Sequence, residues 1–282
     1  MNKKLLLLIG LGLLLTGSVI AQELPILWED HFEDDDLLAH KNVGWIYYPE
    51  QDVAGQIVEQ REGALFIEAG SYGGLVGVGL VETNGIPEIV LDEDGNITDS
   101  TIALSTTDQW GDPNQILTFQ INFARFTTSN FFVGTRMPLD SSRGDVDPTE
   151  SPAYALVLSP LTDAVICGKY AGPMAALAPD TWTYFHAGEA FDFDLEVYYW
   201  VKWYLNEGDI KAKVWEGDPE DEPEEWLFEL VDPEPRVEGN FTMFAAMGAP
   251  PAPGGGDQYY LDDIVMRATS TRSEERRVGK EC

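Results

Sequence analysis

The chain has 282 residues and a formal net charge of -32 at pH 7, from 49 acidic and 17 basic side chains. This charge excludes nucleic acid as a natural partner, because phosphate binding needs a basic surface, and it disfavours anionic membrane surfaces. A hydrophobic fraction of 44% permits a large core, while the two cysteines, Cys167 and Cys282, form no disulfide framework.

The first 21 residues have the pattern of a secretory signal peptide. Lys3 and Lys4 precede an apolar run, Leu5–Leu15, and Val19–Ala21 supplies a small-residue cleavage site. We therefore expect a secreted, periplasmic or cell-surface protein that keeps no membrane attachment after cleavage behind Ala21. The alternative is an uncleaved membrane anchor, although the apolar run is short for a membrane span.

The sequence that follows has the pattern of strands and turns that is typical of an all-β protein. Short apolar runs alternate with clusters of glycine, proline, asparagine and aspartate, and no amphipathic helix pattern follows the signal peptide. Many short strands with turns between them predict an antiparallel sandwich or barrel, with one domain over residues 22–271. In chain order the expected strands are 26–32, 56–60, 64–69, 116–126, 131–137, 154–159, 181–185, 191–197, 226–230, 240–247 and 259–266.

The stretch Tyr198–Trp215 predicts a central β-hairpin. Two aromatic-rich runs flank the polar turn Asn206–Asp209, which contains a glycine. Because strand side chains alternate between faces, one face is apolar and the other combines aromatic and basic residues. Rings on this second face can stack on sugar rings while the lysines donate to hydroxyls; alternatively, the rings cover a second apolar layer beneath the lysine stems. The second face comprises Trp200, Lys202, Tyr204, Lys211, Lys213 and Trp215.

The string RSEERRVGKEC at residues 272–282 is basic in an otherwise acidic chain. It resembles the translation of a sequencing-adapter oligonucleotide, so we expect it to lie outside the fold and the natural protein to continue beyond Thr271. The alternative is a short disordered basic tail.

Four segments between Trp28 and Met266 together resemble the concanavalin A-like lectin/glucanase superfamily. They are WEDHFEDDDL followed by Gly44-Trp45, FFVGTRM followed by YALVL, the hairpin WVKW…GDIKAKVW followed by EPEEW, and the closing YYLDDIVM. Their order is similar to that of secreted bacterial laminin-G-like modules and of 3-keto-glycoside hydrolase-type domains. The resemblance implies an antiparallel jelly-roll β-sandwich, a fold that hosts both binding modules and enzymes.

The resemblance also implies a structural calcium ion that bridges the first loop and the last strand. Glu33 belongs to the opening motif, and Asp262 and Asp263 lie in the closing strand. Calcium takes several hard oxygen ligands, carboxylates among them. The alternative is that one aspartate caps a loop through hydrogen bonds.

A further implication concerns catalysis. Laminarinase-type glycosidases of this superfamily carry a Glu-x-Asp-x-Glu strand, which the sequence DFDLE at residues 192–196 resembles. A retaining glycosidase needs two carboxyl groups about 5–5.5 Å apart, and alternate residues of one strand face supply roughly that separation. Asp192, Asp194 and Glu196 are the candidate catalytic residues if the chain is a glycoside hydrolase. Asp192 is one methylene shorter than the family's glutamate, and the alternative is a polar strand edge before Tyr198.

The candidate carbohydrate site is the aromatic face of the hairpin. Trp200, Tyr204 and Trp215 supply its rings, and the resemblance adds Arg136 and Tyr154 as neighbours on the same sheet. The leading hypothesis is a secreted, non-catalytic jelly-roll module that binds carbohydrate or another extracellular ligand. The alternatives are a glycoside hydrolase of the laminarinase or 3-keto-glycoside hydrolase type, and a structural surface module of a longer protein.

Overall fold

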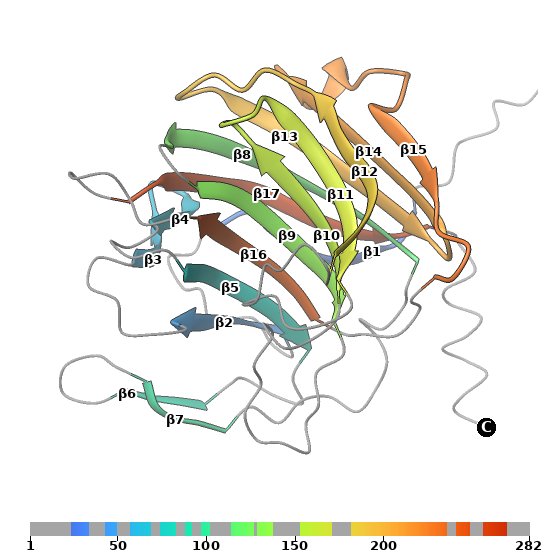
Figure 1. The fold of residues 1–282 in the computed structure, drawn as a ribbon. Helices are drawn as coiled ribbons and strands as arrows, with labels where there is room; N and C mark the ends of the chain where they lie inside the picture. Colours follow the sequence, from blue (N-terminus) through green and yellow to red (C-terminus); the bar gives the residue numbers. More distant parts are fainter. Residues whose placement is uncertain are drawn as a thin grey trace, which may run out of the picture. The chain divides into compact units, whose positions relative to one another are not determined.

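Two antiparallel β-sheets form the body of the chain in the computed structural model (Figure 1). The structure describes residues 24–33, 43–49, 57–68, 74–82, 88–91, 97–101, 114–126, 129–137, 153–170, 182–235, 241–248 and 256–269. The chain divides into two units, and every described strand belongs to the unit Ile26–Thr269. The prediction of an all-β, antiparallel fold is confirmed.

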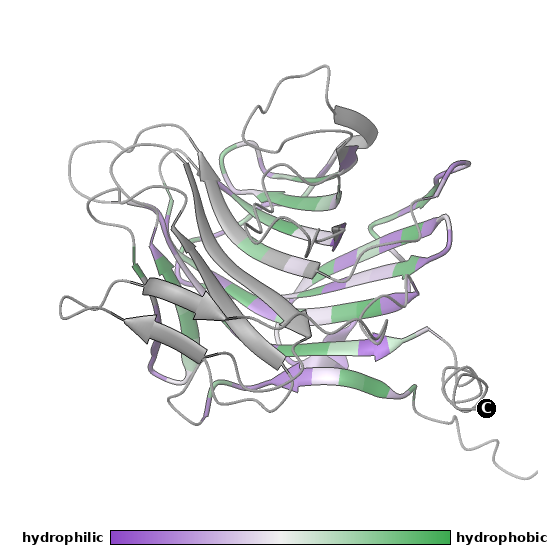
Figure 2. Ribbon diagram, turned by 90° about the horizontal axis from the view of Figure 1, so that it is seen from below, coloured by the Kyte–Doolittle hydropathy of each residue, from purple (hydrophilic) through white to green (hydrophobic). Residues whose placement is uncertain are grey.

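The first sheet has eight strands among the described residues, each antiparallel to its neighbours. Figure 2 shows hydrophobic and hydrophilic residues alternating along several of its strands, as expected of a sheet with one face on a core. Its order is β15 (Phe228–Val231), β14 (Asp209–Glu216), β13 (Tyr198–Asn206), β8 (Gln115–Arg125), β17 (Gln258–Ala268), β4 (Ala64–Glu68) and β3 (Ile57–Arg61), with β1 (Ile26–Asp30) also paired to β17.

The second sheet has seven strands in the described part of the chain, and it is again antiparallel. Its order is β12 (Trp182–Ala190), β11 (Ala164–Tyr170), β10 (Tyr154–Ser159), β9 (Ser129–Met137), β16 (Phe241–Gly248), β5 (Gly74–Glu82) and β2 (Val43–Pro49). A separate hairpin pairs β6 (Glu88–Leu91) with β7 (Ile97–Thr101). No helix within the described residues is long and apolar enough to cross a membrane.

The core lies between the two sheets and is rich in aromatic rings. Phe119 of β8 meets Phe244 of β16 edge to face, with ring centroids 5.5 Å apart. Phe131 of β9 packs on Tyr259 of β17 at 5.4 Å. All four side chains are fully buried, and each contributes about 1.5–3 kcal/mol through the burial of apolar surface. These contacts join the sheets into the jelly-roll β-sandwich that the resemblance implied.

The central hairpin forms as predicted, from β13 and β14. Its register pairs Trp200 with Trp215 at one end and Asn206 with Asp209 at the turn. The turn therefore consists of Glu207 and Gly208, with Glu207 at a φ of 50°. A Cβ atom on Gly208 would lie 2.4 Å from the backbone oxygen of Asp232, so the close approach of that segment requires glycine.

The segment at residues 191–197 differs from the expectation of a strand. It connects β12 to β13 without joining a sheet. Its Phe193 packs on Phe123 and Tyr199, with centroids 5.0 and 5.4 Å away, so the apolar residue closes one end of the core.

Strand β5 was not expected because its sequence, GLVGVGLVE, is rich in glycine, which weakens the strand pattern.

Candidate functional site

The outer face of the eight-stranded sheet is where aromatic and polar side chains gather. Alternation places these side chains opposite the core residues of the same strands. The register aligns them in three rows across the sheet. The rows are Tyr198–Asn122–Tyr260–Phe66, then Trp215–Trp200–Gln120–Asp262, and then Lys213–Lys202–Thr118–Val265.

We divide this face into two halves. The closed half comprises Trp200, Lys202, Tyr204, Lys211, Lys213 and Trp215, together with the segment 216–227 that contacts them. The open half comprises Tyr198, Gln120, Asn122, Tyr260 and Asp262.

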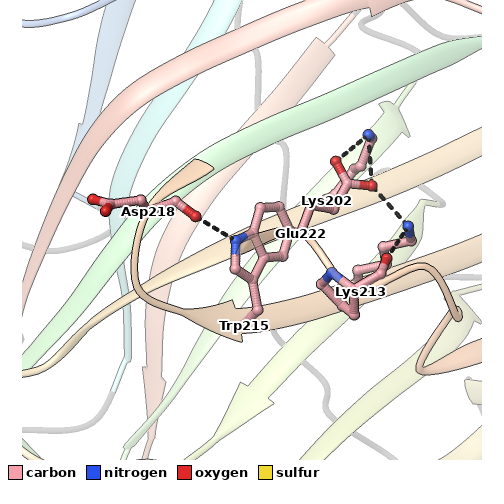
Figure 3. A network of polar contacts seen from close by, with 6 residues as sticks. Lys202, Lys213, Trp215, Asp218 and Glu222 are labelled. Carbon is pink, nitrogen blue, oxygen red and sulfur yellow. Dashed lines mark hydrogen bonds and ion pairs between the residues drawn. The ribbon is translucent and has the colours of Figure 1, made fainter. Parts of the chain in front are cut away.

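In the closed half, the two hairpin tryptophans stack on each other. The rings of Trp200 and Trp215 lie 6.1 Å apart and only 15° from parallel. The two residues are 8% and 7% exposed, respectively. The indole N–H of Trp215 donates to the backbone oxygen of Asp218 at 3.1 Å (Figure 3). The widest aromatic surface of the hairpin is thus occupied by contacts within the protein.

The lysines of the closed half are also occupied. Lys202 Nζ donates to both carboxylate oxygens of Glu222, at 2.9 and 2.7 Å, and Lys213 Nζ donates to one of them at 2.7 Å (Figure 3). Burial raises the pKa of Glu222, but the hydrogen bonds from the two lysines outweigh it and hold the pKa below its ordinary value. Glu222 therefore stays ionised at neutral pH, and its single negative charge bridges two neighbouring cations.

The covering segment has its own local order. The 3-10 turn Pro219–Asp221 begins with a capping box, in which the Asp218 N–H donates to the Asp221 carboxylate at 3.0 Å. Beyond it, the Trp226 ring lies 6.0 Å from that of Tyr204 and 4.7 Å from Lys213 Nζ. This arrangement matches the alternative weighed for the hairpin, a second apolar layer with lysines over it.

The open half keeps an exposed ring. Tyr198 is 42% exposed, although it shares a strand and a face with the buried Trp200. Burial raises the pKa of the Tyr198 phenol, and the nearby Asp262 carboxylate raises it further, so the hydroxyl stays a hydrogen-bond donor at neutral pH. Burial also raises the pKa of Asp262 to about 6. Asn122, between the strands of Tyr198 and Tyr260, is 7% exposed.

The predicted calcium ligands lie at the margin of the open half. Asp262 and Asp263 occupy a β-bulge of β17, where Asp263 has a φ of 47°. The Asp263 carboxylate contacts His31 Nδ1 at 2.7 Å and accepts from Gln120 Nε2 at 2.9 Å. Glu33 lies just after β1. Among the described residues no group of three acidic, histidine or cysteine side chains stands ready to hold a metal, so the calcium site stays a prediction.

Arg136 and Tyr154 lie in the other sheet, in β9 and β10, so the expectation that they share a sheet with Trp200 is wrong. They are 2% and 0% exposed. Arg136 donates to the backbone oxygen of Glu207 at 2.8 Å, and the Tyr154 hydroxyl donates to Asp232. Alternation with Leu156 and Leu158 already pointed Tyr154 inward, a signal that the family resemblance overrode.

The three candidate catalytic acids do not line one strand face, because residues 191–197 form a connection. All three are exposed. The backbone N–H of Asp194 donates to the Tyr199 hydroxyl at 2.8 Å, and that of Glu196 donates to Phe123 O at 3.1 Å, with Glu196 at a φ of 63°. The likeness of DFDLE to a glycosidase strand therefore ends at the sequence.

Sequence reasoning missed three side chains of this face. Glu222 and Trp226 come from the acidic segment after the hairpin, and they close half of the face. Asn122 belongs to a strand that was predicted correctly, and alternation with Ile121 and Phe123 gives its outward direction. Only the pairing of β8 between β13 and β17 shows which rings flank it.

Comparison with known proteins shows the fold and no family. No protein-family model matches the sequence, and no curated protein matches it. One similar structure belongs to work on endo-acting O-glycanases that members of the human gut microbiota express to initiate mucin breakdown; its TM-score is 0.52 at 11% identity, over 87% of this chain and 100% of that one. This likeness shows the fold alone.

Two further structures have TM-scores below one half. The carbohydrate-binding module CBM66 from Bacillus subtilis has a TM-score of 0.44 at 9% identity, over 80% of this chain and 96% of that one. The catalytic domain of an endo-1,3-beta-glucanase (laminarinase) from Thermotoga petrophila RKU-1 has a TM-score of 0.47 at 12% identity, over 88% and 99%.

Proposed function

We propose that the chain is a secreted, non-catalytic jelly-roll module that binds carbohydrate on the outer face of its eight-stranded sheet. The observation that carries the proposal is the exposed Tyr198 ring beside the amides and carboxylate of Gln120, Asn122 and Asp262. An aromatic ring covers the apolar side of a sugar, and neighbouring amide and acid groups bond its hydroxyls. Secretion rests on the N-terminal sequence pattern.

A rigid sheet suits this role. Tyr198, Asn122 and Tyr260 are held by cross-strand hydrogen bonds on three neighbouring strands, so they lose little conformational freedom when a ligand binds. A sheet face suits a polymer, because a chain of sugars can extend across several strands. The sequence-predicted rings of Trp200, Tyr204 and Trp215 lie in the closed half, where they pack on one another or on Trp226, and they are not part of the proposed site.

The test is binding of the full chain to a panel of soluble polysaccharides in affinity electrophoresis, with isothermal titration calorimetry on the positives. The panel holds neutral β-glucan, xylan, galactomannan and arabinogalactan, together with anionic polygalacturonate and alginate. Retardation by at least one polysaccharide supports the proposal. Free migration through every gel overturns it and favours a structural surface module.

Calcium at Glu33, Asp262 and Asp263 is a separate part of the proposal. Carboxylates are the donors that calcium prefers. Both Asp263 oxygens already contact His31 and Gln120, so an ion would have to replace those contacts. A higher Tm in millimolar calcium than in chelator supports the site, because an ion that binds only the folded state stabilises it. An equal Tm in both buffers contradicts it.

A further inference from the structure

Asn122 is a buried polar side chain that the fold does not use. It is 7% exposed, and it makes no hydrogen bond through its side chain to any part of the chain that the structure describes. An amide has two N–H donors and a carbonyl acceptor, and those of Asn122 are not fully buried, so they remain open to solvent. Its direction is outward, since Ile121 and Phe123 on either side of it point into the core.

Two tyrosine rings stand on either side of this amide. The register places Tyr198 of β13 and Tyr260 of β17 directly opposite Asn122 of β8. Neighbouring strands lie about 4.8 Å apart, so the two tyrosine Cα atoms are roughly 10 Å from each other with the amide between them. Gln120 and Asp262 follow in the next row, two residues along each strand. The amide is thus the floor of a strip with aromatic sides.

We infer that the strip Tyr198–Asn122–Tyr260 is the sugar subsite of this face, and that its ligand is a neutral sugar ring. The inference rests on the proposed function and names the place and the ligand class within it. The Asn122 amide bonds two hydroxyls of one ring, and Tyr198 covers an apolar side of the same ring. Asp262, in the next row, accepts from a further hydroxyl.

The charge around the strip selects against acidic sugars. Asp262 and Glu62 both act on the Tyr198 phenol, so negative charge lies close to the ring. Arg61 lies over the Phe66 ring and donates to Glu59 at 2.8 Å, and its guanidinium also hydrogen-bonds the Tyr260 side chain. Because Arg61 is already paired with Glu59, an anionic sugar would meet net repulsion, in a chain whose net charge is -32.

Because the amide lacks a partner within the described residues, its removal separates binding from stability. Asn122→Ala should leave Tm nearly unchanged, because the amide makes no hydrogen bond within the described residues that the fold would lose. The same change should weaken neutral polysaccharide binding about threefold to tenfold, the size of one or two lost hydrogen bonds. Tyr198→Ala should weaken binding about tenfold through the lost stacking surface.

The experiment measures Kd by calorimetry and Tm by circular dichroism for the full chain and three variants, with a neutral polysaccharide from the panel. Tyr204→Ala is the matched control, because Tyr204 shares the strand and face of Tyr198 but packs on Trp226 in the closed half. Loss of affinity in Asn122→Ala and Tyr198→Ala, with Tyr204→Ala within twofold of the parent, supports the strip.

Failure of the strip and failure of the proposed function give different results. If the parent binds a neutral polysaccharide and both strip variants bind it equally well, the strip is wrong while carbohydrate binding stands. Binding confined to polygalacturonate or alginate overturns the neutral ligand class. If the parent binds nothing in the panel, the proposed function fails and the strip fails with it. A lower Tm for Asn122→Ala would show that the amide has a structural role.

Discussion

The closed and open halves lie on one sheet face and share strand β13, yet their polar side chains differ in whether they have hydrogen-bond partners within the protein. In the closed half, Glu222 accepts hydrogen bonds from Lys202 and Lys213, and the backbone oxygen of Asp218 accepts one from the Trp215 indole. In the open half, Tyr198 stays exposed and the Asn122 amide bonds to nothing in the described chain. The covering segment, and not the composition of the strand, decides which aromatic ring remains exposed to solvent.

The halves also respond to pH in opposite directions. Glu222 has a lowered pKa, so its contribution to stability is present above its ordinary pKa and is lost as the pH falls through the folded value. Asp262 has a pKa raised to about 6 from 3.8, so its contribution is complete below pH 3.8 and is lost as the pH rises through 6. At neutral pH the ionised Glu222 therefore stabilises the fold, whereas the ionised Asp262 destabilises it.

The largest expected effect is on the tryptophan stack. Trp215→Ala removes a side chain that is 7% exposed and breaks its contact with Trp200, so we expect the free energy of unfolding to fall by about 3 kcal/mol. Tyr198→Ala, at the exposed end of the same face, should change it by less than about 1 kcal/mol. Urea unfolding followed by circular dichroism measures both values. Equal losses in the two variants would erase the distinction between the halves.

Removal of the bridging carboxylate comes next. Glu222→Ala leaves Lys202 and the buried Lys213 facing each other, and we expect a loss of about 2 kcal/mol because this pair is only partly shielded from water. Glu222→Gln keeps the shape and removes the charge. The difference in free energy of unfolding between Glu222→Gln and the parent should shrink as the pH falls below 4.5. Urea titrations at successive pH values measure it. A difference that persists at low pH would show that shape, and not charge, holds the segment.

The strands of this face could be predicted from the sequence, but its division into halves could not. Alternation around Trp203 and Ile121 gave the core sides of β13 and β8, and the turn with Gly208 gave the hairpin. Those signals are local, with a period of two residues. The cover over Trp215 depends on Glu222 and Trp226, whose segment has no strand pattern, and the flanking of Asn122 depends on pairing with distant β17.

At residues 191–197 and at Arg136 the structure differs from the expectation. Residues 191–197 contain alternating apolar residues, but Phe193 fills the end of the core and so removes the segment from the sheet. The resemblance implies that Arg136 lies on the sheet of the hairpin, and Arg136 does contact the hairpin, through the backbone of Glu207. It reaches it from the other sheet, however, because strand order sets which sheet a residue joins.

The smallest expected effect is at Asp262, where removal of the charge should stabilise the fold, whereas removal of the Glu222 charge should destabilise it. Asp262→Asn removes a half-buried charge beside Asp263, so the variant should be more stable than the parent at pH 8, by about 1 kcal/mol once solvent screening is allowed for. At pH 4 the parent carboxyl is protonated in the folded state, and the gain should vanish. The measurement is urea unfolding at both pH values in chelator, so that calcium does not enter.

Asp263→Asn is the matched control for this charge removal, because it lies one residue away in the same bulge. Its carboxylate bonds His31, whose pKa that hydrogen bond raises, and Gln120, so its removal should destabilise the fold at pH 6. Adjacent aspartates should thus give opposite signs. If Asp262→Asn also destabilises the fold at pH 8, the ionised Asp262 carboxylate stabilises the folded state. The polar groups of the open half are then paired within the protein as fully as those of the closed half.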